Sequence, residues 1–266
     1  DSLLNKLEFA ESDSERVSHQ IALYKFYKNE NGYIAMEWAQ KAYELAKSID
    51  DKNGIELSLR AIRSIAEAQK NYSELYKSNN KLEIIYRQRK DTAKIFECIE
   101  RRYIYNRDQD NFAAAKENLK EIKELNKHLN DKYFKDILNH KGNLYWHMGS
   151  MDSAEYYYLK LNQLAQEDED EEMQRIVLNN IGAIFFHKEE YKSARDVFLQ
   201  VLDIKPINPT EDHITDYMNL SSAYFEMGMD DSSKYYDYKA MAFAKKINRK
   251  SSLELLYGYM IERCEK

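Results

Sequence analysis

Residues 174–206 carry the pattern that most constrains the fold, two amphipathic helical segments joined by a short polar turn. Apolar side chains recur in both segments at the 3.6-residue spacing of an α-helix. They are Ile176, Val177, Leu178, Ile181, Ile184, Phe185 and Phe186 in the first segment, and Tyr191, Ala194, Val197, Phe198, Val201, Leu202 and Ile204 in the second. Gly182 and Ala194 are small enough to let helices approach closely, and Pro206 cannot continue the second helix. The pattern predicts a pair of packed helices.

This stretch resembles the tetratricopeptide repeat (TPR), whose motif runs over about 34 residues as W-x2-L-G-x2-Y, then A-x3-F, then P. The matching residues are Leu178, Ile181, Gly182, Phe185, Ala194, Phe198 and Pro206, with Leu in place of Trp and Phe in place of Tyr. The resemblance implies a helical repeat fold. It also implies a binding role, because TPR domains bind other molecules and rarely catalyse reactions.

Equivalent positions recur along the whole chain. The slot of Gly182 is filled in the other repeats, at steps of 39 or 40 residues, by Leu23, Arg63, Tyr103, Gly142 and Ser221. A fixed period of this size is typical of a helical solenoid. We expect the residues beyond the family's usual length at the end of each second helix and in the loop that follows it.

The sequence therefore predicts an all-α protein, a right-handed α-α superhelix of about six helix pairs with additional N-terminal and C-terminal helices. Only seven Gly and two Pro occur in 266 residues, which favours long helices and short turns over an all-β fold. We expect one domain over residues 1–266. The expected repeats are 15–52, 55–91, 92–131, 133–170, 173–210 and 212–248, followed by a capping or coupling helix at 251–264. Phe198 is expected in the core, and in the last repeat Asp237 occupies the slot equivalent to Phe198.

In the repeat register, the segment 251–264 takes the position of a first helix whose second helix is missing. Its side chains expected to cover the last repeat are Leu253, Leu256, Tyr257, Met260 and Ile261, whereas Leu255 and Tyr259 are expected to point elsewhere. Terminal repeats of solenoids usually present a polar outer face. We therefore expect the native polypeptide to continue beyond Lys266 into a membrane-linked or signalling segment; the alternative is a plain capping helix on a free-standing adaptor.

Composition and motifs exclude several classes of function. The net charge of −6 disfavours nucleic-acid binding through this domain, because such binding needs a basic face. The two cysteines, Cys98 and Cys264, lack the close spacing of a metal or disulfide site. No phosphate-binding glycine loop, dinucleotide fingerprint or nucleophile elbow is present. We expect no enzyme activity, no catalytic residues, no metal and no cofactor.

The candidate ligand-binding residues follow from the resemblance, because the first helix of each TPR lines a concave groove. The positions expected to face this groove are Asn139, Asn143, Trp146, His147, Asn179, Asn180, Phe186, His187, Asn219, Ser222 and Phe225. An Asn amide both donates and accepts hydrogen bonds and can hold an extended peptide backbone. Arg60 and Arg101 in the earlier repeats could meet an acidic partner. The cations of TPR domains that clamp a C-terminal carboxylate are missing from the equivalent slots, which hold Asn139, Thr215 and Asn219.

The favoured hypothesis is a binding module for a protein or an extended peptide segment. The style of the repeats is similar to the sensor or input regions of Bacteroidetes-type signalling proteins, which implies the periplasmic side of a membrane-anchored regulator. Two alternatives are a cytoplasmic TPR regulator of the peptide-pheromone type and a free-standing adaptor. An enzyme with an unrecognised site is a remote alternative.

Overall fold

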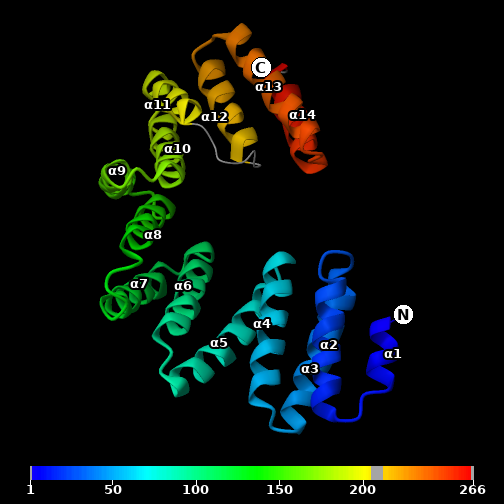
Figure 1. Ribbon diagram of the computed structural model, residues 1–266. Helices are drawn as coiled ribbons and strands as arrows, with labels where there is room; N and C mark the ends of the chain where they lie inside the picture. The colour runs from blue at the N-terminus through cyan, green and yellow to red at the C-terminus, as the bar shows by residue number, and fades with distance from the viewer. Residues whose placement is uncertain (1, 205–211, 265–266) are drawn as a thin grey trace. The chain divides into compact units, whose positions relative to one another are not determined.

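The computed structural model describes residues 2–204 and 212–264, and every regular element in these ranges is an α-helix (Figure 1). The helices are α1 (Ser2–Glu8), α2 (Asp13–Tyr27), α3 (Gly32–Ser48), α4 (Lys52–Ala68), α5 (Tyr72–Arg89), α6 (Thr92–Asp108), α7 (Phe112–Lys127), α8 (Phe134–His147), α9 (Met151–Glu167), α10 (Glu171–His187), α11 (Tyr191–Asp203), α12 (Asp212–Glu226), α13 (Asp230–Lys246) and α14 (Lys250–Cys264). The expected all-α class is confirmed. Pro206, expected to terminate a helix, and the side chain of Cys264 lie outside the described parts of the chain.

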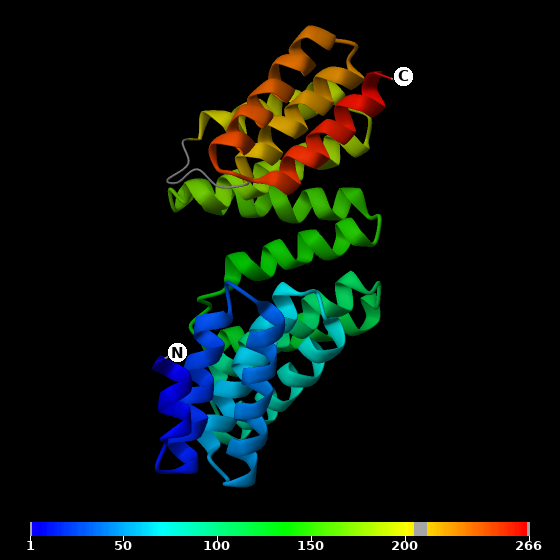
Figure 2. The same ribbon diagram turned by 90° about the vertical axis from the view of Figure 1, so that its right-hand side faces the viewer.

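The helices form two compact units, Asp1–Phe134 and Lys135–Lys266. Within each unit, consecutive helices run antiparallel as hairpins, from blue to green in the first unit and from green to red in the second (Figures 1 and 2). Buried apolar clusters lie between successive helices rather than in one central core, for example among α8, α9 and α10 and among α10, α11 and α12. This distribution is typical of a repeat protein, in which each repeat packs on its neighbours. A single continuous domain over both units stays a prediction.

The turns between helices repeat every 20 residues in the first unit. Asp50, Lys70, Lys90 and Asp110 each adopt a left-handed backbone conformation, with φ between 53° and 57°. The residue that follows each of them, Asp51, Asn71, Asp91 or Asn111, caps the next helix by accepting a hydrogen bond from a backbone N–H of its first turn. The two halves of the second repeat, and the first half of the third, are therefore equally long. In these repeats the expectation that extra residues collect in the second helix and its loop is wrong, because both helices share them.

The two helices of a repeat meet where residues 16 positions apart face each other. Gly142 faces Tyr158, and Gly182 faces Phe198: a Cβ atom added to either glycine would lie 2.4 Å from the Cε1 atom of the opposing ring. The rings of Tyr158 and Phe198 are each 2% exposed, so the prediction that Phe198 belongs to the core is confirmed. The missing side chain of the glycine makes the room that the ring fills.

The equivalent slots of two other repeats are polar and satisfied internally. In the second repeat, the Arg63 guanidinium donates a hydrogen bond to Asn79 Oδ1 (3.1 Å), and Asn79 Nδ2 donates to the Cys98 carbonyl (2.9 Å). Burial raises the pKa of the neighbouring Cys98 thiol to about 11. Since a thiol with a raised pKa holds its proton, Cys98 is a buried, unreactive side chain rather than a nucleophile.

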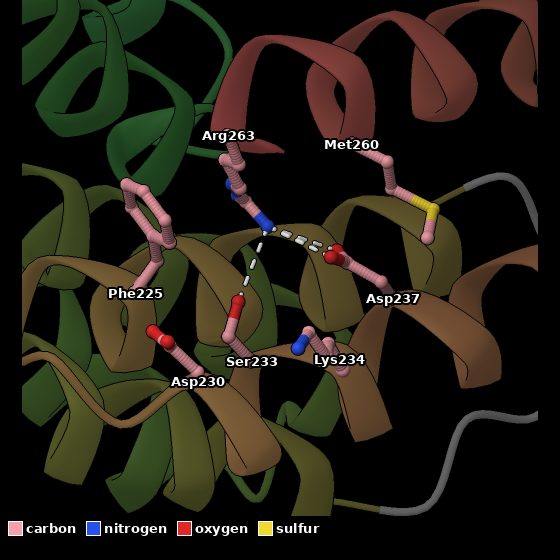
Figure 3. A pocket seen from close by; sticks show the side chains of 7 residues that line it. All are labelled: Phe225, Asp230, Ser233, Lys234, Asp237, Met260 and Arg263. Carbon is pink, nitrogen blue, oxygen red and sulfur yellow. Dashed lines mark hydrogen bonds and ion pairs between the residues drawn. The ribbon is translucent and has the colours of Figure 1, made fainter. Parts of the chain in front are cut away.

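In the last repeat, Ser221, Ser233 and Asp237 fill the slots held by Gly182, Ala194 and Phe198 one repeat earlier. Figure 3 shows Arg263 of α14 reaching toward Ser233 and Asp237. One guanidinium nitrogen of Arg263 donates to Ser221 Oγ (2.6 Å) and to both Asp237 carboxylate oxygens (2.9 and 3.0 Å). The other donates to Ser222 Oγ (2.8 Å). The Asp237 side chain is only 5% exposed. A buried carboxylate thus anchors the last helix.

Apolar contacts add to this anchor. Leu256 is buried, and Leu253 and Met260 pack on the cluster between α12 and α13. Leu255 and Tyr259 are exposed, as expected. Tyr257 and Ile261 were expected to cover the last repeat, but they are 47% and 60% exposed because the helix turns its Leu256 and Arg263 face inward. Of the N-terminal segment, α1 packs on α2, while Phe9 is exposed.

Gly182→Ala should lower the free energy of unfolding by about 1–3 kcal/mol, because the new methyl group would overlap the ring of Phe198. Denaturant unfolding measures this loss. Gly258→Ala is the matched control, since Gly258 lies in α14 with nothing within 4 Å of an added Cβ. The control should be neutral or slightly stabilising. Equal effects of the two substitutions would contradict the packing account.

Arg263→Ala should release α14, because it leaves the Asp237 carboxylate buried without its main cation, a loss of about 3–5 kcal/mol when a buried pair is broken. Hydrogen exchange of α14 amides in the full chain should become more than tenfold faster. Lys246→Ala, which removes an exposed cation of α13, should leave the exchange unchanged. The double variant Arg263→Met, Asp237→Leu should restore protection, since an apolar pair needs no partner. Unchanged exchange in Arg263→Ala would show that the ion pair does not hold the helix.

Candidate functional site

Two adjoining hollows lie in the second unit and are lined by residues of α8, α10, α11, α12 and α14. The first, which we call the aromatic hollow, has a volume of about 440 Å³. It is lined by Trp146, Ala183, Phe186, His187, Glu189, Tyr191, Phe198, Asn219 and Ser222. The second, the C-terminal hollow, has a volume of about 340 Å³. It is lined by Phe186, Met218, Asn219, Ser222, Phe225, Glu226, Tyr259 and Arg263. Because Phe186, Asn219 and Ser222 belong to both, the hollows form one groove across successive helices.

The aromatic side chains of the groove are held at fixed positions by their neighbours. The Trp146 ring meets His187 edge-on, with centroids 5.7 Å apart, and joins α8 to α10. The Phe186 ring meets Tyr191 edge-on at 5.3 Å. Phe225 receives the guanidinium of Arg263 over its ring, at 5.3 Å from the centroid. Ordered rings beside open volume are suited to accepting an apolar side chain of a ligand.

The charges around the groove are mostly acidic. Glu189 lines the aromatic hollow and Glu226 lines the C-terminal hollow, and both are exposed. Burial, together with these two carboxylates, raises the pKa of Tyr191, so its hydroxyl stays protonated. Among the described residues that line the two hollows, Arg263 is the one permanent cation, and Asp237 already neutralises it. The groove therefore favours neutral or basic ligand groups over a free carboxylate.

A chain of polar groups runs from two buried side chains to the point where the two hollows meet. Arg175 of α10 forms an ion pair with Asp216 of α12, and the two side chains are 3% and 2% exposed. Asn179 Nδ2 donates to Asp216 Oδ1 (2.7 Å), and Asn219 Nδ2 donates to Asn179 Oδ1 (3.2 Å). Asn219 thus connects the interior of the unit to the groove.

Six of the residues predicted from the sequence line this groove, namely Trp146, Phe186, His187, Asn219, Ser222 and Phe225. Asn179 lies behind them in the polar chain. Four others do not line the hollows. Asn143 accepts a hydrogen bond from the Tyr158 hydroxyl (2.7 Å), the Asn139 side chain is half-buried, Asn180 is half-buried and His147 is exposed. Their role in ligand binding stays a prediction.

The two predicted arginines belong to the first unit. Arg60 is exposed, and Arg101 forms an ion pair with Glu67. That pair reduces the charge that Arg101 could offer to an acidic partner, and the role of both residues stays a prediction.

Several groove residues were not predicted from the sequence. They are Glu189, Tyr191, Phe198, Tyr259 and Arg263 in the lining, and Arg175 and Asp216 behind it. One signal was present: Ser221, Ser233 and Asp237 stand in slots that hold small or aromatic residues one repeat earlier. Polar side chains in buried slots imply a polar partner, which is Arg263.

Within the described ranges, no group of three or more His, Cys, Asp or Glu side chains is arranged to hold a metal ion. The same ranges contain no helix that is both long and apolar enough to cross a bilayer.

Residues 136–206 match the family model of the tetratricopeptide repeat. No curated protein matches the chain by sequence. Among solved structures, NprR in complex with its cognate peptide NprX is similar with a TM-score of 0.68 at 12% identity, covering 100% of this chain and 78% of that one. The Rap conjugation gene regulator of plasmid pLS20 in complex with the Phr* peptide has a TM-score of 0.67 at 12% identity, covering 93% and 85%.

A third similar structure is aspartyl phosphate phosphatase F from Bacillus subtilis, with a TM-score of 0.68 at 16% identity over 80% of this chain and 58% of that one. These likenesses concern the fold alone, and in the described ranges of this chain helix pairs follow one another. Residues 136–206 are tetratricopeptide repeats, and the chain as described has the fold of a TPR-like helical solenoid.

Proposed function

We propose that this chain is a non-enzymatic binding module whose groove in the second unit takes an extended peptide segment of another protein. The observation that carries the proposal is the row of Trp146, Phe186 and Phe225 on successive first helices, with the amide of Asn219 between the hollows. Apolar anchors with a few placed polar groups are the usual composition of a peptide or ligand groove. Two structures with similar folds are described as complexes with peptides, which supports this choice.

The charges of the groove restrict the kind of segment. Glu189 and Glu226 attract basic groups, and the Arg263 guanidinium is engaged by Asp237. We therefore expect an internal segment, or one with a neutral or basic end, that carries aromatic or aliphatic side chains. A segment held by its C-terminal carboxylate is not expected.

The finer role is the input domain of a larger signalling or transcription-regulatory protein. It is supported by the resemblance of the repeats to such input regions and by the similar fold of the regulator of plasmid pLS20. A phosphatase activity is the alternative suggested by the name of the third similar structure. We favour binding, because the groove residues supply anchors and amides but no nucleophile paired with a base.

Selection of random linear peptides on the immobilised chain should enrich sequences with apolar and basic residues. Binding of an enriched synthetic peptide, measured by fluorescence anisotropy, should weaken at least tenfold in the double variant Trp146→Ala, Phe186→Ala, because the truncation of each anchoring aromatic loses about 1 kcal/mol or more. Amidation of the peptide's C-terminus should not reduce its affinity.

Tyr238→Ala is the matched control, because Tyr238 is an aromatic residue of α13 that is 60% exposed and lines neither hollow. Its affinity should equal that of the unmodified chain. Melting curves verify that the double variant, whose rings also pack on the core clusters, stays folded. No enrichment of peptides, or full affinity in a folded double variant, would contradict the proposed function.

A further inference from the structure

In the polar chain behind the groove, the chemistry of Asp216 determines which group donates and which accepts each hydrogen bond. The Asp216 carboxylate accepts hydrogen bonds and has no hydrogen to donate, and it is almost fully buried beside Arg175. Its neighbour Asn179 must therefore turn its NH₂ group toward Asp216, as the 2.7 Å contact between Asn179 Nδ2 and Asp216 Oδ1 shows. The opposite orientation of the Asn179 amide would place two acceptor oxygens against each other.

The orientation of the Asn179 amide in turn fixes the orientation of the Asn219 amide in the groove. With its NH₂ group on Asp216, Asn179 offers its Oδ1 atom to the next side chain, and Asn219 Nδ2 donates to it at 3.2 Å. The Asn219 amide is thereby held in one of its two possible orientations. Its Oδ1 atom, an acceptor with two lone pairs, belongs to a side chain that lines both hollows.

Resting on the proposed function, we propose that Arg175, Asp216 and Asn179 position Asn219 as a hydrogen-bond acceptor between the two hollows, so that the ligand must present a backbone N–H group at this point. Two apolar side chains of the segment then flank that N–H and enter the aromatic hollow and the C-terminal hollow. Glu189 and Glu226 place further negative charge along the groove, which suits a donor group of the ligand.

The polar chain contains more residues than are needed to join α10 to α12. An ion pair between α10 and α12 would hold the two helices without any contact to the groove, and Asn179 and Asn219 extend it to the surface. A buried charge pair carries a large desolvation penalty, which a purely structural role could avoid with apolar side chains of similar size. Apolar side chains could not, however, hold a hydrogen-bond acceptor in a fixed orientation in the groove.

The test uses peptides enriched in the selection described above. Each backbone N–H of such a peptide is replaced in turn by an ester oxygen, which removes one donor and keeps the shape. At one position the ester should weaken binding about tenfold in the unmodified chain. In Asn219→Leu the amide peptide and the ester peptide should bind with nearly equal affinity, because the acceptor is gone.

The positioning role of Asn179 has its own readout. In Asn179→Leu, the Asn219 amide is free to turn, so the difference between amide and ester should fall to about threefold while Asn219 itself is unchanged. Gln200→Leu is the control, since Gln200 is an exposed amide of α11 outside both hollows, and it should keep the tenfold difference. A tenfold difference that persists in Asn179→Leu or in Asn219→Leu would overturn the proposal.

A measurement without ligand tests the polar chain itself. The side-chain NH₂ protons of Asn179 and Asn219 should exchange slowly with water in NMR spectra of the free chain, and Asn179→Leu should speed the exchange of the Asn219 protons at least tenfold. Unchanged exchange would overturn the positioning role. Failure to enrich any peptide would contradict the proposed function and remove the ligand assignment with it, whereas an enriched peptide that tolerates every ester would overturn this inference alone.

Discussion

Complementary packing between the two helices of each repeat, at positions 16 residues apart, is the interaction on which the structure depends. In the repeats that contain Gly142 and Gly182 the two positions share one buried space, so a ring on the second helix requires a residue without a side chain on the first. The third repeat instead holds two large buried residues at these positions, Tyr103 and Leu119. In the first repeat the equivalent positions hold Leu23 and Ala39, both buried, and glycine at 142 and 182 leaves room for Tyr158 and Phe198. Where the shared space is polar, the groups satisfy one another, as Arg63 does with Asn79. Native packing density leaves no room for an unmatched change.

This packing decides which surface is left for binding. Because the second helices pack on the first helices of their own and the following repeat, the groove is built chiefly from first helices, and in the second unit these are α8, α10 and α12. In the last repeat the shared space takes the guanidinium of Arg263. The same contact that closes the core therefore brings Tyr259 and Arg263 of α14 to the wall of the groove.

The helix pairs, their number and the core position of Phe198 follow from the sequence, because apolar spacing and small-residue slots are local signals. Six groove-lining residues also follow from the register together with the resemblance to the tetratricopeptide repeat. The polar chain from Arg175 to Asn219 could not be predicted, because the side chains that bond to one another lie 37 to 41 residues apart and polar side chains carry no periodic signal. The outward turn of Tyr257 and Ile261 depends on the anchor at Asp237, which only the folded chain reveals.

The most direct test of complementary packing exchanges large and small residues across one repeat. Gly182→Leu and Phe198→Ala reproduce the arrangement of Leu23 and Ala39 in the first repeat. Phe198→Ala alone should lower the free energy of unfolding by about 3–5 kcal/mol, and Gly182→Leu alone should lower it through overpacking by about 1–3 kcal/mol or more. Measured by denaturant unfolding, the double variant should be at least about 2 kcal/mol more stable than the sum of the single losses predicts. Losses that add to within about 0.5 kcal/mol would contradict the account, because independent sites add and coupled sites do not.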